Sequence, residues 1–490
     1  MTTLTGNKLV LAAILLAAAN FIVVLDMTIA NVSVPHIAGG LAISASEGTY
    51  VITSYAIAEA ISVPLTGWLA TRFGTVRAFT TCFFLFGLFS MMCGLANNLG
   101  FLVAGRILQG LSGGPLMPLS QTLLMFVFPK EKRMAAMAIW SMTTLIAPIL
   151  GPIFGGYICD TLGWPWIFFI NIPLVIICGI AVTVLLKPFE TEAVKAKIDI
   201  VGLLLLVIFV GSFQYMLDEG QKLDWFSSNE IILLLVFALV GFIAFLIWET
   251  TEENPIVDLK VFKSRGYSIS VLTISLVFGA FFGSMVLTPL WLQTNMGYTA
   301  TWSGLTMAAN GVLAVIVAPF AAKLANKVDL RILVTLGVSW IGFITFMRSF
   351  GTSDMTYAQI ALPILFQGLG MPFFFIPLSS LALSSVAPRQ IASAAGLMSF
   401  LRTLSGAFST SLVTTTWINQ AAANRTELVS SLQYHQEIPI AELNQLVDSQ
   451  SVMLATNHIF QIAAVVFILA ATVIWIAPKS SQPANPAAAH

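Results

Sequence analysis

The chain has 490 residues, of which 58% are hydrophobic and only 9% are charged. Soluble globular proteins carry about 25% charged residues, so this composition excludes a water-soluble globular protein and indicates a membrane protein. The formal net charge of zero also excludes a general electrostatic attraction to nucleic acid.

Long apolar segments follow one another along almost the whole chain. A helix needs about 20 apolar residues to cross a bilayer, and fourteen segments approach or meet this requirement. We therefore predict an all-α membrane protein with 14 transmembrane helices. The predicted spans are residues 9–33, 48–69, 78–96, 101–124, 135–158, 167–186, 200–217, 231–248, 268–291, 303–324, 331–349, 358–385, 391–417 and 453–477.

The basic residues predict how this multi-pass protein is oriented. An even number of spans places both termini on one side of the membrane. Apart from Arg106 and Arg402, which lie inside the predicted helices, Lys and Arg gather on that side, and only Lys222, Arg348 and Arg425 fall on the other side. Because basic loops are retained in the cytoplasm, both termini are predicted to be cytoplasmic. The first apolar segment is too long for the core of a signal peptide, so we expect a retained helix.

Two polar linkers divide the predicted spans into groups of six, two and six. Parallel six-helix halves around a central site are a known transporter plan. Residues 1–187 are the predicted N-terminal bundle, and 188–265 are a two-helix insertion with its cytoplasmic linkers. Residues 266–490 are the C-terminal bundle, which includes a long, polar, external loop over 419–452.

Four charged residues lie clearly at membrane depth, away from the ends of the predicted spans: Asp26, Glu59, Arg106 and Arg402. A charge at membrane depth is costly and should face the bundle interior or a wet cavity, where it marks a functional site. The alternative for each is a satisfied ion pair or a side chain that reaches the interface.

Asp26 and Arg106 are the strongest candidates, because both fall near mid-helix and have opposite charge. A neighbouring Arg stabilises the charged form of an Asp, and loss of that contact favours proton uptake. We expect this pair to couple transport to protons. Glu59 is a second candidate, which either shares the proton or contacts cationic substrates.

Small residues and prolines follow helical spacing in two spans. Arg106, Gln109, Gly110 and Gly113 share one helical face, which offers charge, an amide and room for a neighbouring backbone. In the fifth span, small residues recur every four positions and two prolines bend the helix. These small residues and prolines of the fifth span are Ala147, Pro148, Gly151, Pro152 and Gly155. They indicate close packing of this helix against a neighbour. The functional alternative is that this packing seals the outer side of the transporter against leakage.

The short loop between the second and third spans carries Gly67, Arg72, Gly74 and Arg77. Basic residues in such a loop either enforce topology or latch the two halves together.

Polar and aromatic residues within the spans are candidates for a substrate pocket, which should lie near the midplane between the halves. Pockets of broad specificity favour aromatic and Met side chains that re-pack. The candidates are Gln121, Gln214, Trp340, Gln367, Phe374 and Arg402. Packing in the core or against lipid is the alternative for each.

No catalytic, metal or cofactor motif is found. The four histidines are scattered without metal-ligand spacing, and the four cysteines show no CxxC pair. The phosphate-binding pattern GxxxxGK[ST] is absent, so ATP hydrolysis is not expected. We expect no enzyme activity and no cofactor, and we expect an ion gradient, by preference of protons, to supply the energy.

Taken in order, these segments resemble motifs of the major facilitator superfamily, and in particular of its fourteen-helix drug:proton antiporters. Residues 67–77 resemble motif A, with Thr71 in place of the usual Asp. Residues 102–114 resemble motif B, and 147–156 resemble the antiporter motif C, with Ala147 for its first Gly. Residues 25–35 resemble the first-helix motif that carries the Asp.

The resemblance implies the major facilitator fold and export of hydrophobic drugs or toxic compounds across a bacterial inner membrane by alternating access. It also implies partnership with a membrane-fusion adaptor and an outer-membrane channel. A lipid, fatty-acid or siderophore exporter with the same fold is the main alternative. A non-transporting sensor or scaffold is a third, which leaves the acid of the first span unexplained.

Overall fold

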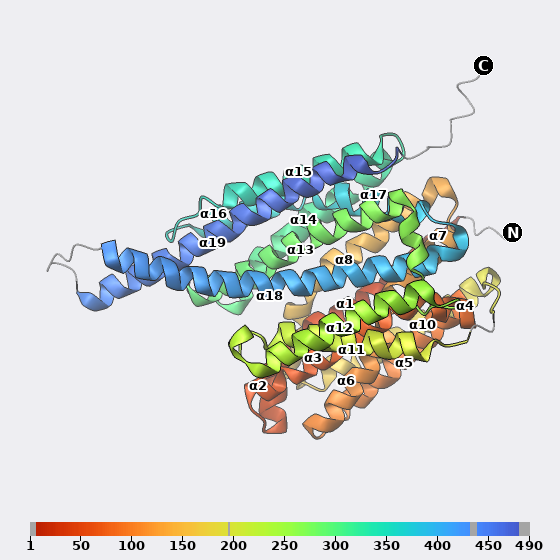
Figure 1. The fold of residues 1–490 in the computed structure, drawn as a ribbon, viewed down its shortest axis with the longest axis horizontal. Helices are drawn as coiled ribbons and strands as arrows, with labels where there is room; N and C mark the ends of the chain where they lie inside the picture. The colour runs from red at the N-terminus through yellow and green to blue at the C-terminus, as the bar shows by residue number, and fades with distance from the viewer. Residues whose placement is uncertain (1–5, 195–196, 432–438, 480–490) are drawn as a thin grey trace, which may run out of the picture.

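The computed structural model describes residues 6–194, 197–431 and 439–479. Every regular element in these ranges is helical. The helices lie roughly parallel along the long axis of the molecule (Figure 1). The α-helices are α1 (Asn7–Leu41), α2 (Ala45–Gly48), α3 (Tyr50–Ser62), α4 (Thr66–Phe73), α5 (Thr75–Gly94), α6 (Leu99–Gly113), α7 (Leu116–Val127), α8 (Arg133–Thr161), α9 (Trp166–Phe169), α10 (Asn171–Leu186), α11 (Ile200–Glu219), α12 (Asn229–Thr251), α13 (Arg265–Thr294), α14 (Ala300–Ala325), α15 (Leu330–Arg348), α16 (Tyr357–Gln367), α17 (Met371–Ser384), α18 (Ile391–Ser431) and α19 (Ile440–Val473).

Within the described residues, eleven helical segments are long and apolar enough to cross a membrane. The prediction of an all-helical, multi-pass membrane protein is therefore confirmed. The remaining predicted spans fall on α8 and on two interrupted helices. Residues 48–69 are divided by the short 3₁₀-helix η1 (Val63–Leu65), which contains Pro64, and 101–124 are divided by a turn before Pro115.

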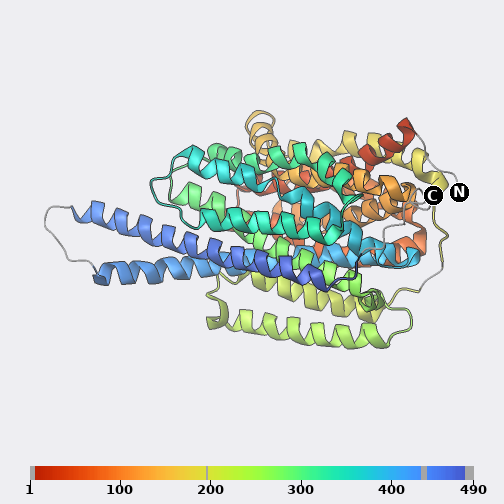
Figure 2. The same cartoon turned by 90° about the horizontal axis from the view of Figure 1, so that it is seen from above.

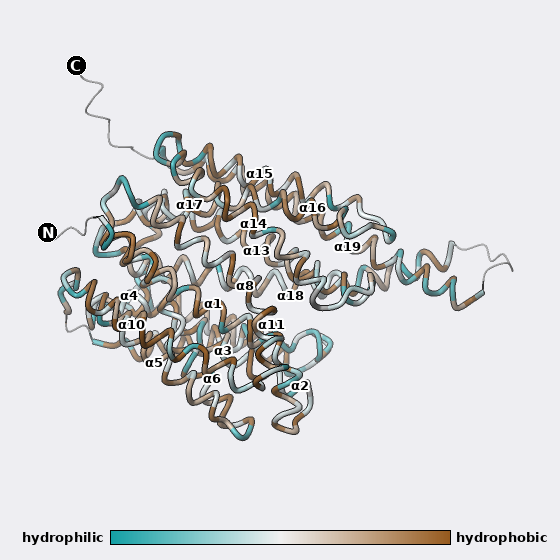
Figure 3. The backbone as a smooth tube through the Cα atoms, turned by 180° about the vertical axis from the view of Figure 1, so that it is seen from behind, coloured by the Kyte–Doolittle hydropathy of each residue, from teal (hydrophilic) through white to brown (hydrophobic). Residues whose placement is uncertain are grey.

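The distribution of polarity along the helices fits a membrane. Hydrophobic stretches run through the middle of the bundle, whereas hydrophilic segments gather at its two ends and on the projecting hairpin of α18 and α19 (Figure 3). Apolar side chains on the outside of α12 are exposed, among them Leu233, Val240 and Ile247. Such side chains suit contact with lipid tails, because a soluble protein would bury them.

α11 and α12 pack against each other at one edge of the bundle (Figure 2). α11 also contacts α3 and α18, so this pair touches helices from both ends of the chain. The segment before α11 returns along α4, where the backbone N–H of Val194 donates to the carbonyl of Thr71 at 2.9 Å.

The predicted external segment over 419–452 is helical at both of its ends. Residues 419–431 continue α18 and residues 440–452 begin α19, so both helices project beyond the bundle (Figures 1 and 2). The polar composition excludes these residues from the bilayer but not from a helix. Ala, Gln, Glu and Leu, which are frequent here, have high helix propensity.

Candidate functional site

Asp26 of α1 and Arg106 of α6 form an ion pair in the interior of the helix bundle. The Nη1 of Arg106 lies 2.7 Å from the Oδ2 of Asp26, and the two side chains are 0% and 1% exposed, respectively. The pairing predicted from the sequence is confirmed. Because a buried charge is expensive to leave alone, each group stabilises the charged form of the other.

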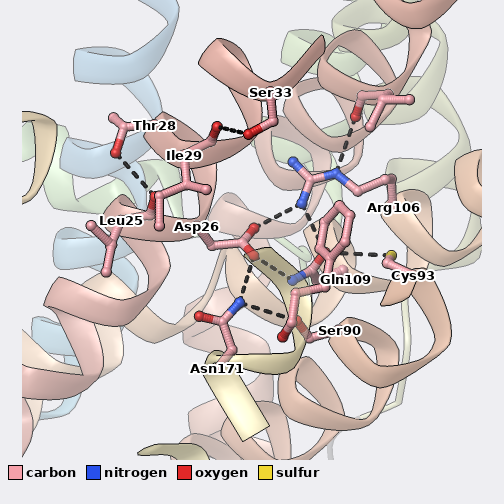
Figure 4. Close-up of polar contacts among 12 residues, drawn as sticks. Leu25, Asp26, Thr28, Ile29, Ser33, Ser90, Cys93, Arg106, Gln109 and Asn171 are labelled. Atoms are coloured by element: carbon pink, nitrogen blue, oxygen red, sulfur yellow. Dashed lines mark hydrogen bonds and ion pairs between the residues drawn. The ribbon is translucent and has the colours of Figure 1, made fainter. Parts of the chain in front are cut away.

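Two amides hold the second carboxylate oxygen (Figure 4). The Nδ2 of Asn171 donates to the Oδ1 of Asp26 at 2.6 Å, and the Nε2 of Gln109 donates at 3.1 Å. Gln109 also accepts from the Nη1 of Arg106 at 2.8 Å, and Asn171 donates to the hydroxyl of Ser90 at 3.0 Å. Helices α1, α6 and α10 therefore meet at one carboxylate, and α5 supports it through Asn171.

The guanidinium of Arg106 is enclosed on its other sides. Its Nε donates to the backbone carbonyl of Val51 at 3.1 Å. Its Cζ lies 4.1 Å from the centre of the Tyr55 ring and 5.6 Å from the centre of the Phe168 ring, which are cation–π distances. The Nη2 of Arg106 has no hydrogen-bond partner among the described residues. One donor is thus free to follow the carboxylate or another acceptor when the helices move.

This arrangement suits a proton switch. An ionised Asp26 is held by three donors, so its charge is satisfied in a dry interior. Proton uptake removes the attraction to Arg106 and leaves a buried guanidinium without a counter-charge.

Glu59 of α3 lies near this pair but forms no ion pair within 4 Å among the described residues. Its carboxylate interacts electrostatically with Arg106, Arg402 and Asp26. Arg402 of α18 contacts the sulfur of Met117, and its Cζ lies 5.2 Å from the centre of the Phe278 ring.

The glycines predicted to support packing lie at close helix contacts. A Cβ at Gly151 of α8 would lie 2.6 Å from the Cβ of Thr28, and one at Gly155 would lie 3.2 Å from the carbonyl oxygen of Ile29. α8 therefore approaches α1 within a turn of Asp26. Gly110 of α6 approaches the backbone of α3 in the same way. Pro148 and Pro152 belong to α8, but their side chains lie outside the described residues.

The loop between α4 and α5 is held by the segment that follows α10. Gly74 has a φ of 87°, which suits glycine, and the backbone N–H groups of Val76 and Arg77 donate to the Glu190 carboxylate at 3.1 and 3.0 Å. The exposed Arg77 also lies 3.7 Å from this carboxylate. Arg72 is partly buried and forms no ion pair among the described residues. Gly67 instead makes the contact with α18, where a Cβ would lie 2.9 Å from the Cα of Ser393.

The residues predicted to bind substrate separate into two groups. Gln367 of α16 lines a hollow between α13, α14, α15 and α16, and Phe374 of α17 lines a neighbouring hollow between α8, α13, α14 and α17. Gln121 of α7 is 0% exposed, and neither polar atom of its amide has a partner among the described residues. Gln214 of α11 donates to Asp218 at 3.2 Å, and the half-exposed Trp340 of α15 donates to the carbonyl of Phe366 at 2.7 Å. These last two do not line either hollow.

The sequence did not single out Asn171 or Arg348. Asn171 is a neutral amide at the start of a helix, and only the packing of α10 on α1 brings it to Asp26. Arg348 was predicted on the external side, but it is only 9% exposed and donates to Thr288 and Gln367. A run of polar residues follows Arg348 in the sequence. This run is typical of an external loop, so the sequence favoured a position outside the bundle.

No group of three or more His, Cys, Asp or Glu side chains in the described part of the chain is arranged to hold a metal ion. The fold and the site together define a class of protein, a many-helix membrane transporter with charged residues inside its bundle. The chain belongs to the Major Facilitator Superfamily, whose family model matches residues 16–410.

Within this superfamily the chain resembles the multidrug exporter EmrB. It is 45% identical to the "Multidrug export protein EmrB" of Haemophilus influenzae, over 96% of each chain. It is 42% identical to the "Fatty acid resistance protein FarB" of Neisseria gonorrhoeae, over 97% of each chain. The solved structure of the proton:xylose symporter XylE shares the fold, with a TM-score of 0.62, 14% identity and 97% coverage of each chain.

Proposed function

We propose that this protein is a proton-coupled antiporter that exports hydrophobic drugs or toxic compounds by alternating access. The observation that carries the proposal is the buried Asp26 carboxylate, held by Arg106, Gln109 and Asn171. A carboxylate inside a membrane transporter is a proton-relay candidate by its cost alone. The names of the relatives, which include multidrug export and fatty acid resistance, support export as the activity.

In the proposed cycle, Asp26 is deprotonated when substrate enters from the cytoplasm or the inner leaflet. The two bundles then rock, and the site opens to the outside. A proton from that side neutralises Asp26, weakens its attraction to Arg106 and releases the substrate. Glu59, whose carboxylate interacts electrostatically with Arg402 and Arg106, either shares this proton or meets cationic substrates.

We further propose fourteen spans, arranged as six, two and six, in the inner membrane of a bacterium with both termini cytoplasmic. In this assignment α3 with α4, α6 with α7, and α8 complete the eleven long apolar segments. Residues 1–187 and 266–490 form the two bundles, and 188–265 hold the inserted pair α11 and α12. The basic loops support the orientation.

The proposed partners are a membrane-fusion adaptor and an outer-membrane channel, which would give substrate one path out of a double-membraned cell. The ends of α18 and α19 project beyond the bundle at the end opposite the start of α1 (Figure 1). With cytoplasmic termini, this hairpin faces the periplasm, where an adaptor would sit.

Proton movement in proteoliposomes tests the proposal. Adding a hydrophobic drug to vesicles of the wild-type protein should drive proton flux, and Asp26→Asn should abolish it, because the amide matches the carboxylate in size but carries no exchangeable charge. Asp224→Asn is the matched control, since Asp224 is an exposed acid outside the helix bundle. Full drug-driven proton flux in Asp26→Asn would refute the role of Asp26.

A fatty-acid or other lipid exporter is a second candidate, which the 42% identity to the fatty acid resistance protein favours. Inverted vesicles that accumulate a labelled fatty acid, but no hydrophobic dye, would select this candidate. Accumulation of structurally unrelated dyes would select multidrug export.

A further inference from the structure

The inserted helix α11 is hydrogen-bonded to α18 along one of its faces. The hydroxyl of Ser411 donates to the backbone carbonyl of Leu217 at 3.0 Å. The hydroxyl of Thr415 donates at 2.9 Å to the Oε1 of Gln221, in the turn that follows α11. The two contacts are four residues apart on both partners, so the segments run side by side in the same direction. We call this face of contact the α18 seam.

Apolar side chains extend the α18 seam towards the middle of the bundle. The ring of Phe213 stacks on the ring of Phe408, with their centres 6.3 Å apart. Ala407 packs against the buried cluster of α11 and α12 that includes Leu217 and Ile231. None of the side chains in the seam is charged, so it is held by packing and by neutral hydrogen bonds.

The neighbouring face of α11 contacts α3, which belongs to the N-terminal half of the chain. The carboxylate of Asp218 is hydrogen-bonded to the side chains of Thr53 and Gln214. The Nζ of Lys222 lies 3.5 Å from the hydroxyl oxygen of Thr49. Each contact residue on this face lies one position after a residue of the α18 seam, a step that turns a helix by about 100°. α11 therefore lies in the angle between α3 and α18.

The linker that leads into α11 is attached to the N-terminal bundle. The backbone N–H of Thr75 donates to the hydroxyl of Thr191 at 2.9 Å, and the Nε1 of Trp68 donates to the backbone carbonyl of Lys197 at 3.3 Å. These bonds add to those that the Glu190 carboxylate accepts from the start of α5. Hydrogen bonds to charged groups are roughly twice as strong as neutral ones, so the attachment of α11 to this bundle is stronger than the α18 seam.

The chain changes its attachment only after α12. The backbone N–H of Val257 donates to the carboxylate of Glu249, which belongs to α12, at 3.1 Å. The next residue, Asp258, accepts from the side chain of Gln390, just before α18, at 3.0 Å. The point at which the chain passes from the inserted pair to the C-terminal bundle thus lies between two consecutive residues, beyond both inserted helices.

We propose that α11 and α12 move as part of the N-terminal bundle, and that the α18 seam parts and re-forms in every transport cycle. In this role α11 covers the opening between α3 and α18, and the seam is the place where that cover separates from the C-terminal bundle. The proposal rests on alternating access as described above and assigns a function to the inserted pair.

Reversible cross-linking at two consecutive positions tests which contact of α11 must part. Gln221→Cys with Thr415→Cys bridges the α18 seam, and Lys222→Cys with Thr49→Cys bridges α11 to α3. Both double variants are made without the native cysteines and are joined by a short bismethanethiosulfonate. In proteoliposomes we expect the first bridge to reduce export of a hydrophobic dye at least tenfold, and a thiol reductant to restore it. The second bridge should leave export within twofold.

Distances between spin labels test the same motion without a need for transport. Labels at Glu230→Cys and Asn97→Cys report α12 against the N-terminal bundle, whereas Glu230→Cys and Asn419→Cys report α12 against α18. All three positions are exposed. A bound ligand shifts the populations of the states. Adding the dye to the labelled protein in nanodiscs should therefore change the distance from Glu230 to Asn419 and leave the distance from Glu230 to Asn97 unchanged.

Full export with the Gln221–Thr415 bridge closed would overturn the proposal, as would loss of export with the Lys222–Thr49 bridge. A constant distance from Glu230 to Asn419, or a change confined to the Glu230–Asn97 pair, would also overturn it. The bridges and labels report motion and not protons. Drug-driven flux that persists in Asp26→Asn therefore refutes proton coupling alone, and a seam that need not part leaves the role of Asp26 standing.

Discussion

At the scale of residues, two buried arginines differ in whether an acidic side chain neutralises their charge. Arg106 is neutralised within the protein by Asp26, and its charge is available only when that carboxylate takes a proton. Arg348 has only neutral partners, so its charge is available at all times. A neutralised and an unneutralised arginine thus occur in different parts of one helix bundle.

Asn171→Leu tests how far the amides stabilise the charged Asp26. The change keeps the number and branching of the side-chain heavy atoms but removes a donor at 2.6 Å from the carboxylate. Loss of a hydrogen bond to a charged group costs about 1.5–3 kcal/mol, so the thermal unfolding midpoint should fall by several degrees. Asn97→Leu, in an exposed loop, serves as the control. Equal midpoints for the two variants would contradict this role.

Asp329 supplies a test of pH dependence outside the spans. The Arg331 side chain donates to the Asp329 carboxylate, with 2.9 Å between Nη2 and Oδ2. The backbone N–H of Arg331 donates to the same carboxylate. These hydrogen bonds hold the pKa of Asp329 below its usual range. Because the folded-state pKa is lowered, the stabilisation is present above the unfolded pKa and is lost as the pH falls through the folded value. Asp329→Asn, which keeps the helix cap, should lower stability at pH 7 by about 1 kcal/mol or less.

The measurement is thermal unfolding of the solubilised wild-type and Asp329→Asn proteins at pH 7 and near pH 3. The difference in midpoint should shrink at the lower pH. A difference that stays constant or grows on acidification would show that the ion pair does not contribute in this way.

The Asp26 and Arg106 pair was predictable because isolated charges of opposite sign in apolar helices have few alternatives to pairing. Asn171 was not, because nothing in an amide at a helix start indicates what lies across the bundle. Arg348 lies at the end of a span, where the sequence pattern is the same for an exposed and an inward-facing side chain.

At the scale of elements, the approach of α8 to α1 decides how Asp26 is held. Gly151 packs against Thr28, whose hydroxyl lies 3.4 Å from the carbonyl oxygen of Ala147. α1 is thereby fixed against α8 on the turn that follows Asp26. Small residues let helix backbones approach closely in membranes, where packing drives association.

Gly151→Ala adds a Cβ that would lie 2.6 Å from the Cβ of Thr28, so α8 must move away from α1. Overpacking of this kind costs about 1–3 kcal/mol, and we expect lower thermal stability together with reduced drug-driven proton flux. Gly156→Ala is the matched control, because a Cβ there has no heavy atom within 4 Å. It should be neutral or slightly stabilising, since Ala favours a helix.

The sequence predicted that the spans are helical, but it did not predict where a helix is interrupted or extended. The interruptions at Pro64 and before Pro115 lie within apolar runs, and hydropathy alone is blind to them. Conversely, α18 continues without a break to Ser431, beyond its apolar part. The residues there have high helix propensity, so the helix does not end where the apolar segment ends.

At the scale of the whole molecule, helices from either side of the chain midpoint pack together, α8 against α14 and α17, and α18 against α4 and α7. Trp140 of α8 stacks on Phe375 of α17 with ring centres 6.1 Å apart. A Cβ at Gly396 of α18 would lie 3.0 Å from the Cβ of Thr66, next to the contact of Gly67 with Ser393. This second contact lies near the end of the molecule where α1 begins (Figure 1). In the proposed alternating cycle, we expect this contact to keep that end closed and to break when the end opens.

Gly67→Ala tests whether this contact stabilises the closed end. The added Cβ would lie 2.9 Å from the Cα of Ser393, which is backbone and cannot rotate away. We expect α4 and α18 to separate, so that a larger population is open at this end.

Spin labels at Thr71→Cys and Arg389→Cys, which are exposed positions beside the contact, report the separation in a background without native cysteines. The distance distribution should gain a longer component. Gly304→Ala, where a Cβ meets nothing within 4 Å, should leave it unchanged, and an unchanged distribution in Gly67→Ala would show that the closed end does not depend on this contact.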